Sequence, residues 1–533
     1  MTKGHVVMGL LFFPRGGSAQ VARYLSAALM RSGWSVDLVA GSLGGPGDET
    51  DASTFFTGIP TRPLDYSGAV EVFAAGGSAV GAPVPMHPSY EDREGAPDVV
   101  FAAVAPGLVE HLSSVWEPLF EAAGAGRADV VHLHHLTPQH DAVRRRWPDR
   151  AVVAHLHGTE TKFIEAVSER VGLARSLGTT LAGMPAWVAA HRRADRRLDP
   201  APAALVRTTR WEQWIHGEYW CDRLRRQAQA ADHLVVVSPT ERHTAADTLG
   251  VDAERITDVP NGVDVSRFAP RPMSPVERRA RFRHWLVEDP QGWDAGGAPG
   301  TVAYREADLD RLLGRPGPSG PRSESEGAAP VLIFVGRFSA AKRVPLLVRA
   351  FARARGHAGF RASLLVWGGH PGEWEGEHPV DAARDVGADG IFFAGWRGHD
   401  DLPEALAACD ALVMPSVDDS YPQTPLEAMA VGLPVIATTS GGFPFIVNVD
   451  PVRPTGWLVP PDDEGALAEA LVDAVARPYE MRRRGAAALA HAREHLSWSG
   501  RVAGFEEAYA SARDRRARRQ GRRRSSPPDV SCP

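Results

Sequence analysis

Asp419 and Glu427 are separated by seven residues, in a stretch that predicts a strand, a polar loop, a helix and a second strand. The apolar run 411–414 is short and bounded by turns, as a strand buried on both faces would be. Gly432 and Pro434 end the expected helix. The loop with the carboxylates therefore leads from the carboxyl end of a strand into a helix N-terminus. Open α/β sheets bind ligands at such places, and a helix N-terminus favours anions.

A second interpretation of Glu427 involves no ligand. The run Thr424-Pro425-Leu426-Glu427 has the pattern of a capped helix start, with Thr424 as the N-cap and Glu427 closing a capping box. Asp419 by itself would be a solvated loop residue. The two interpretations differ in whether Glu427 contacts a ligand or only stabilises the helix.

Basic and glycine residues follow two other expected strands. Arg337 and Lys342 come directly after the apolar run 331–336. Arginine offers planar bidentate contacts and lysine a point charge, so the pair is suited to a diphosphate, although isolated cations are more often solvated. Gly16 and Gly17 precede the first expected helix and would let the main chain approach a phosphate or a sugar closely. The turn lacks Gly-x-Gly-x-x-Gly, so a dinucleotide cofactor is not indicated.

Histidines form two pairs with i,i+2 spacing, His132 with His134 and His155 with His157. Their apolar, glycine and threonine neighbours favour residues at strand ends beside a ligand over a four-ligand zinc site. We therefore expect no metal, although the spacing alone leaves a metal site open. Glu160 either contacts an acceptor or begins the helix that follows.

Three motifs together resemble those of the retaining GT-B glycosyltransferases of glycosyltransferase family 4. They are the block 419–442 with its carboxylates and final Gly-Gly, the Val-Gly-Arg-x-x-x-x-Lys pattern over 335–342, and Pro-Asn-Gly-Val-Asp over 260–264. Two positions depart from the family pattern. The first acid is usually Glu and is Asp419 here, and Phe445 stands where an acid often follows the glycine turn.

The resemblance implies roles for these residues. Asp419 would bind hydroxyls of the donor sugar, and Glu427 the ribose of the nucleotide. Arg337 and Lys342 would balance the leaving diphosphate, so neither a divalent metal nor a cofactor besides the nucleoside diphosphate sugar is expected. His157 would lie close to the transferred sugar. The expected catalytic residues are Arg337, Lys342, His157 and Asp419. The expected donor site consists of Gly16, Gly17, Gly336, Arg337, Lys342, Gly395, Trp396, Asp419, Thr424, Leu426 and Glu427. The expected acceptor contacts are His134 and Glu160.

Strands alternate with helices twice along the chain. This predicts an α/β fold with two doubly wound Rossmann-like domains facing across a cleft, the GT-B type. The expected divisions are 1–268 for an N-terminal acceptor-binding domain with a helical insertion at 161–230, 269–329 for a linker or insertion, 330–485 for a nucleotide-sugar-binding domain, 486–512 for a helix returning toward the N-terminal domain, and 513–533 for a disordered, Arg-rich tail.

Composition is ordinary for a soluble globular protein, with 44% hydrophobic and 23% charged residues in 533. The three cysteines are far apart and support neither a disulfide framework nor a cysteine-rich metal site. We see no secretory signal and no run near the roughly 20 apolar residues of a membrane span, so a cytoplasmic location is expected. The tail 513–533 holds eight Arg and two Asp. It is most simply a solvated end, with peripheral contact to an anionic inner membrane face as an alternative; no specific nucleic acid is expected.

The resemblance to glycosyltransferase family 4 implies an enzyme. It would transfer a hexose-type sugar from a nucleoside diphosphate sugar to a hydroxyl of a small-molecule or glycan acceptor, with retention of anomeric configuration. UDP is favoured because it is the commonest donor nucleotide in the family. One alternative is a polysaccharide- or disaccharide-forming synthase of the same fold. Another is a nucleotide-sugar-binding protein that has lost catalysis.

Overall fold

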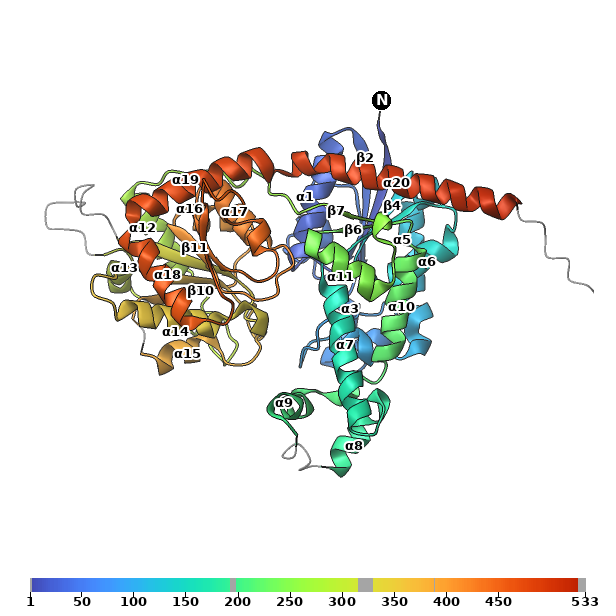
Figure 1. Ribbon diagram of the computed structural model, residues 1–533, viewed down its shortest axis with the longest axis horizontal. Coiled ribbons are helices and arrows are strands. Elements are labelled where there is room, and N and C mark those ends of the chain that lie inside the picture. The colour runs from blue at the N-terminus through green and yellow to red at the C-terminus, as the bar shows by residue number, and fades with distance from the viewer. Residues whose placement is uncertain (1, 192–197, 315–328, 388, 526–533) are drawn as a thin grey trace, which may run out of the picture. The chain divides into compact units, whose positions relative to one another are not determined.

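The structure is a computed structural model that describes residues 2–191, 198–314, 329–387 and 389–525. The chain forms two compact units (Figure 1), one made of 1–260 with 501–533 and the other of 261–500. Each unit contains a parallel β-sheet with helices packed against it. This confirms the predicted α/β fold with two Rossmann-like domains.

The first unit is built on a seven-stranded parallel sheet of order β3-β2-β1-β4-β5-β6-β7. Its strands are β1 (Gly4–Leu10), β2 (Trp34–Ser42), β3 (Thr61–Asp65), β4 (Val130–His134), β5 (Val152–His155), β6 (His233–Val236) and β7 (Ile256–Asp258). Its helices are α1 (Gly17–Arg31), α2 (Ala52–Phe55), α3 (Ser67–Ala74), α4 (Val109–Ser114), α5 (Glu117–Ala122), α6 (Pro138–Arg146), α7 (Thr159–Ser176), α8 (Met184–Ala190), α9 (Pro200–Thr208), α10 (Gly217–Ala230) and α11 (Pro239–Leu249). The central strands are buried along their whole length, as expected for apolar runs covered by helices on both faces.

The second unit is built on a six-stranded parallel sheet of order β10-β9-β8-β11-β12-β13. Its strands are β8 (Val331–Gly336), β9 (Ser363–Gly368), β10 (Ile391–Gly395), β11 (Ala411–Met414), β12 (Val435–Thr438) and β13 (Gly456–Val459). Its helices are α12 (Pro275–Arg283), α13 (Glu306–Leu313), α14 (Val344–Arg355), α15 (Pro379–Asp385), α16 (Leu402–Ala407), α17 (Gln423–Val431), α18 (Glu464–Ala476) and α19 (Pro478–His495). The strand order reverses beside β8, so β8 and β11 diverge at a topological switch point, where such sheets bind ligands.

The division between the units falls after Pro260, earlier than the expected boundary at 268. The segment that follows is fixed to the second unit by its own polar groups. Asn261 Nδ2 donates to the carbonyl of Tyr421 at 3.1 Å, and the Val263 amide donates to the carbonyl of Leu496 at 2.7 Å. Contacts between residues so distant in sequence leave no periodic signal, so the sequence could not place this boundary.

The described part of the expected linker is an ordered segment of the second unit. A capping box of Ser274 and Glu277 begins α12. Arg278 then donates to the Asp410 carboxylate at 2.6 Å, and Trp293 is buried with its indole N–H on the carbonyl of Gly369 at 2.8 Å. Residues 315–328 of the expected linker lie outside the described residues.

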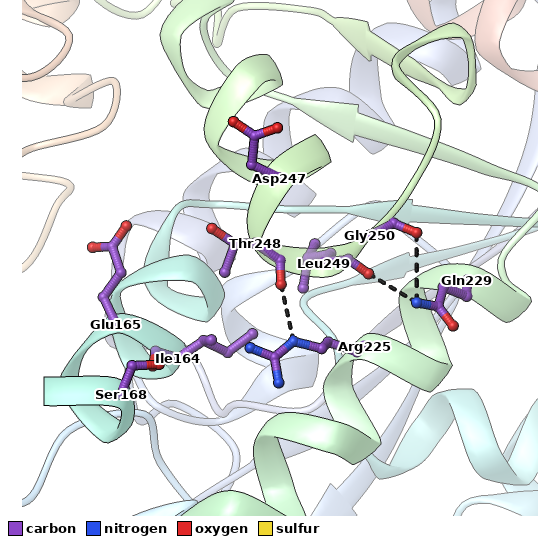
Figure 2. Close-up of a pocket in the computed structure, with 9 residues that line it drawn as sticks. All are labelled: Ile164, Glu165, Ser168, Arg225, Gln229, Asp247, Thr248, Leu249 and Gly250. Carbon is purple, nitrogen blue, oxygen red and sulfur yellow. Dashed lines mark hydrogen bonds between the residues drawn. The ribbon is translucent and has the colours of Figure 1, made fainter. Parts of the chain in front are cut away.

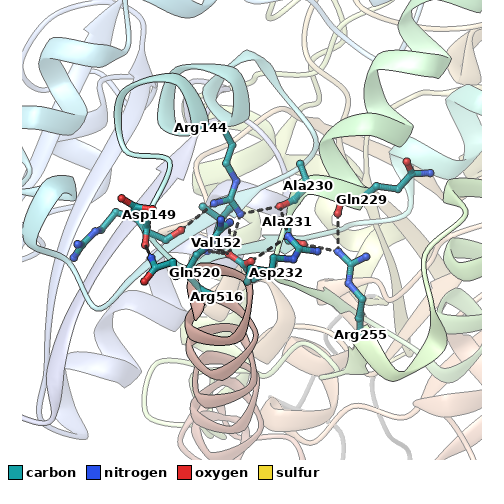
Figure 3. Close-up of polar contacts among 12 residues, drawn as sticks. Arg144, Asp149, Val152, Gln229, Ala230, Ala231, Asp232, Arg255, Arg516 and Gln520 are labelled. Carbon is teal, nitrogen blue, oxygen red and sulfur yellow. Dashed lines mark hydrogen bonds and ion pairs between the residues drawn. The ribbon is translucent and has the colours of Figure 1, made fainter. Parts of the chain in front are cut away.

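The Arg-rich tail differs from the expected disordered end. Helix α20 (Trp498–Ser525) continues through it, and residues 526–533 lie outside the described part of the chain. Figure 3 shows Asp232 beside Arg144 and Arg516. The fully buried carboxylate of Asp232 pairs with these two arginines at 2.9 Å and with Arg519 of α20 at 3.3 Å. A buried carboxylate needs such partners. The composition of the tail predicted a solvated segment, because composition cannot show that these arginines pair with Asp232, which is distant in the sequence.

None of the helices in the described residues is long and apolar enough to cross a membrane.

Candidate functional site

In the second unit, the predicted diphosphate-binding lysine lies against the predicted sugar-binding acid. Lys342 ends the short turn after β8, and its Nζ donates to both carboxylate oxygens of Asp419 at 2.8 Å. Both side chains are about four-fifths buried. The Val417 amide donates to the carbonyl of Ala341 at 2.8 Å and so joins the two loops. Arg337, at the end of β8, is exposed. The structure thus brings Lys342 and Asp419 into direct contact.

The Asp419 loop rests on the glycine turn after β12. The Gly442 amide donates to the carbonyl of Asp419 at 2.7 Å. A Cβ at Gly441 would lie 2.2 Å from that carbonyl oxygen, and a Cβ at Gly442 would lie 2.2 Å from the carbonyl oxygen of Ser420. Glycine is therefore required here for close approach of two main-chain segments. The Gly442 amide thus serves to hold the Asp419 loop in place.

Glu427 is buried inside α17 and pairs with His399. The helix begins at Gln423 with Pro422 as its N-cap and has no side-chain cap. Thr424 is therefore not the cap, and the capping-box interpretation of Glu427 is wrong. Its Oε1 lies 2.8 Å from His399 Nε2 instead, and the Glu427 side chain is only 3% exposed. Pro422 has φ −69° and an extended ψ of 140°, so it lies outside the helix, which begins at Gln423.

His399 was not predicted from the sequence. It lies in the loop after β10, and its ring packs edge-on against Phe268 at 5.4 Å between ring centroids. Leu426 is fully buried, so any ligand contact from it would come from its main chain. In the sequence, the signal for a partner such as His399 is Glu427 itself, because a glutamate among the apolar residues of a buried helix requires a polar partner.

The other expected donor residues separate into exposed and structural positions. Trp396 is 37% exposed and its ring lies 5.5 Å from that of His370. Its neighbour Arg397, which is not among the expected donor residues, has a side chain only 5% exposed and donates to Asp289 and to the carbonyl of Trp285, both at 2.9 Å. Gly395 has φ +75°, and a Cβ there would lie 1.9 Å from the carbonyl oxygen of Gln291. This glycine accommodates the ordered segment before β8. Gly336 ends β8 and packs beside Phe334.

In the first unit, Gly16 and Gly17 form an open helix N-terminus. Gly16 is the N-cap of α1, and no atom lies within 4 Å of a Cβ added at either glycine. Both are exposed. The preceding Arg15 pairs with the buried carboxylate of Asp98 at 2.7 Å. The main-chain groups of this turn are thus accessible, and their contact with an anionic ligand stays a prediction.

His157, His134 and Glu160 lie together at the carboxyl ends of β4 and β5. His134 Nδ1 is 3.0 Å from His157 Nε2, and Glu160 Oε1 is 2.7 Å from His135 Nδ1. Burial, with His135 and His132 adding to it, lowers the pKa of His157 well below its usual value. Burial raises the pKa of Glu160, but the charge and hydrogen bond of His135, together with main-chain hydrogen bonds from Glu160 and His157, more than offset this, so the pKa is lowered. At neutral pH the site thus holds a neutral imidazole and a carboxylate.

His135 was also missed by the sequence analysis. It follows β4 with a φ of +65°, which only the surrounding contacts can maintain in a residue with a side chain. Its ring packs against His157 with centroids 4.5 Å apart. It therefore couples Glu160 to the imidazole of His157.

A recess of about 470 Å³ lies elsewhere on the first unit, between α7, α10 and α11 (Figure 2). Its polar side chains are tied to the end of α11: Arg225 Nε donates to the carbonyl of Thr248 at 3.0 Å, and Gln229 Nε2 to that of Leu249 at 3.1 Å. No predicted site residue lines it. It is thus separate from the residues discussed above.

The two parallel sheets, each with helices packed against it, define the two-domain architecture of the GT-B class. The sequence profile of the family described as "Glycosyltransferase Family 4" matches residues 15–267, and that described as "Glycosyl transferases group 1" matches 329–477. The chain belongs to glycosyltransferase family 4. This confirms the resemblance seen in its motifs.

Individual proteins agree with this assignment. The chain is similar to a D-inositol 3-phosphate glycosyltransferase of Actinosynnema mirum, with 37% identity over 216 residues, 39% of this chain and 50% of the relative. The chain thus spans about half the length of the curated relatives it matches. Among solved structures, it resembles the catalytic domain of starch synthase IV from Arabidopsis thaliana bound to ADP and acarbose. The TM-score is 0.59, with 14% identity and coverage of 96% of this chain and 99% of that one. It also resembles Anabaena HepE in complex with UDP, with a TM-score of 0.54, 15% identity and coverage of 95% and 99%. At these identities the structures show the fold alone.

Proposed function

We propose that the protein transfers a hexose-type sugar from a nucleoside diphosphate sugar, with UDP-sugars as the first donors to test, to a hydroxyl acceptor with retention of configuration. The observation that carries this proposal is the Lys342–Asp419 pair beside the switch point of the second sheet. A cation and an acid held together there can contact a diphosphate and an adjoining sugar. The complexes of HepE with UDP and of starch synthase IV with ADP support a nucleotide donor.

In this mechanism the leaving diphosphate gains negative charge while the sugar becomes oxocarbenium-like. Lys342 and Arg337 stabilise that charge, so no divalent ion is needed to balance the leaving diphosphate. Asp419 holds sugar hydroxyls, and its bond to Lys342 fixes the ammonium position before the donor binds. Glu427, oriented by His399, binds the ribose. No protein nucleophile is required, because the leaving phosphate accepts the acceptor proton on the same face of the sugar.

On the acceptor side, His157 contacts the incoming hydroxyl compound, and the buried Glu160 positions this histidine through His135 and through the His157 amide. Relatives named D-inositol 3-phosphate glycosyltransferases make a phosphorylated cyclitol the first acceptor to test. The exposed glycine turn at Gly16–Gly17 is suited to a phosphate of either substrate.

The test begins with thermal stabilisation by a panel of nucleotide sugars. The stabilising donor is then incubated with inositol phosphates and cell extract, and products are identified by mass spectrometry and by NMR of the anomeric proton. A transferred sugar with donor-like anomeric configuration is expected. Donor hydrolysis without transfer would point to a missing acceptor, and binding without any turnover would favour a binding protein. A product with inverted configuration would contradict the proposal.

Variants test the leaving-group role. Arg337→Ala and Lys342→Ala should each lower turnover about a hundredfold, the usual effect of removing one such charge-stabilising group. Arg343→Ala is the matched control, because Arg343 follows Lys342 directly and pairs with Asp462 on the surface. Turnover like wild type in both Arg337→Ala and Lys342→Ala would contradict the proposal that these cations stabilise the leaving diphosphate.

A further inference from the structure

Three histidines of the first sheet gather on one of its faces. His132 and His134 are two residues apart on β4, and His134 is aligned with His155 on the neighbouring β5. Residues two apart on a strand, and residues aligned across strands, point to the same face. All three side chains are fully buried. Phe505 of α20 packs over them, with its ring 5.8 Å from that of His132 and 5.4 Å from that of His155.

One ring nitrogen from each of the three lies within 4.8 Å of one from each of the others. The hydrogen-bond partners do not account for every nitrogen. His134 Nε2 and His155 Nε2 are buried and have no partner within the protein. Such groups are costly in a protein interior and call for an explanation. We infer that His132, His134 and His155 form a buried site for a transition-metal ion of the imidazole-preferring class, with Zn²⁺ as the reference ion.

The hydrogen-bond partners of the three imidazole rings fit one assignment of ligand atoms. His132 Nε2 and His155 Nδ1 are 3.2 Å apart, close to the roughly 3.3 Å that separates two imidazole nitrogens bound about 2.0–2.1 Å from one tetrahedral zinc ion. His134 then ligates through its Nε2, which gives that nitrogen a partner, whereas the Nε2 of His155 stays without one in this assignment.

The second nitrogens of two ligands have acceptors in this assignment. His132 Nδ1 is 2.8 Å from the Tyr509 hydroxyl, and His134 Nδ1 is 3.0 Å from His157 Nε2. Metal-bound histidines usually donate from the other nitrogen in this way. The ion would therefore hold His134, and through it His157, in one orientation, and would not contact the transferred sugar. The histidine site would therefore be structural. It is compatible with a donor diphosphate that is balanced by Lys342 and Arg337 and binds no metal ion.

Metal content tests the inference directly. Tag-free protein is purified from cells grown with added Zn²⁺ or Co²⁺ and analysed by mass spectrometry of the elements. About one ion per chain is expected, with the visible d–d absorption of four-coordinate cobalt in the second sample. Less than about a tenth of an ion per chain from both media would overturn the inference and leave a hydrogen-bonded histidine cluster.

Matched variants locate the ion. His132→Gln/His155→Gln should lose the metal, whereas His233→Gln should keep it, because His233 is a buried strand histidine of the same sheet that bonds to Thr257. Equal metal content in all three proteins would overturn the assignment. If the double variant does not fold, Tyr509→Phe serves instead. It should lower zinc affinity about 10- to 100-fold in competition with a chelator, and unchanged affinity would contradict the role of His132.

Discussion

Gly441→Ala should disable the donor site without altering a charged group. A Cβ at this position would lie 2.2 Å from the Asp419 carbonyl oxygen, so the Asp419 loop has to move by about 1 Å to reach an ordinary contact. That movement separates Asp419 from Lys342, whose Nζ now bonds both carboxylate oxygens at 2.8 Å. A misplacement of about 1 Å in a catalytic site typically costs about a hundredfold in rate. We therefore expect kcat/KM for the donor to fall about a hundredfold.

The backbone contributes separately, since Gly441 has φ +59°. Alanine in that left-handed region costs roughly 1–2 kcal/mol of folding free energy. Gly432→Ala is the control. Gly432 has a φ of +101°, but a Cβ added there would have Leu489 Cδ2 at 4.0 Å as its nearest neighbour, so it meets no clash. Both variants should thus lose stability in a denaturant titration, and only Gly441→Ala should lose activity. Activities within about threefold of each other would refute the reasoning.

Three further predictions concern single side chains. Glu427→Gln should raise the donor dissociation constant about tenfold, the effect of about 1.4 kcal/mol in a charged hydrogen bond. A lower melting temperature with unchanged donor affinity would limit Glu427 to holding His399. Asp232→Asn should lower the free energy of unfolding by about 3 kcal/mol or more, because it leaves buried arginines without their counter-ion; chemical denaturation measures this, and a loss below 1 kcal/mol would contradict it. Burial and neighbouring arginines lower the pKa of His233 to about 4 from 6.5. Only the unfolded state then binds its proton between those values, so stability is lost as pH falls from 6.5 toward 4, by at most about 3 kcal/mol. His233→Gln should flatten that part of the pH–stability curve, and an unchanged slope would refute the assignment.

Sequence reasoning recovered the features that depend on neighbouring residues. The buried strand at 331–336 and the glycine turn at 16–17 lie where apolar runs and turn residues predicted them. Ser238 accepts the Glu241 amide and begins α11, a helix start that the run Ser238-Pro239-Thr240-Glu241 indicates by itself. Such signals are local, because helix caps, turns and strand runs are determined within a few residues.

The helix start at Pro422 shows where a local pattern failed. Thr424, Pro425 and Glu427 matched a capping box, but the chain already turns into helix at Gln423. Several caps are compatible with one short sequence, and packing of the following apolar face selects among them. Glu427 was correctly singled out, while its partner His399 required the loop after β10 to fold back.

The sequence by itself determined the alternation of strands and helices, the family motifs and the acidic and basic residues that carry the proposed chemistry. The tertiary structure decided which of them meet: Lys342 with Asp419, Glu427 with His399, the histidines of β4 with those of β5, and the Arg-rich helix with Asp232. The physical reason is that local periodicity fixes backbone form. The pairing of charges distant along the chain depends on which buried groups must be neutralised once the sheets have packed.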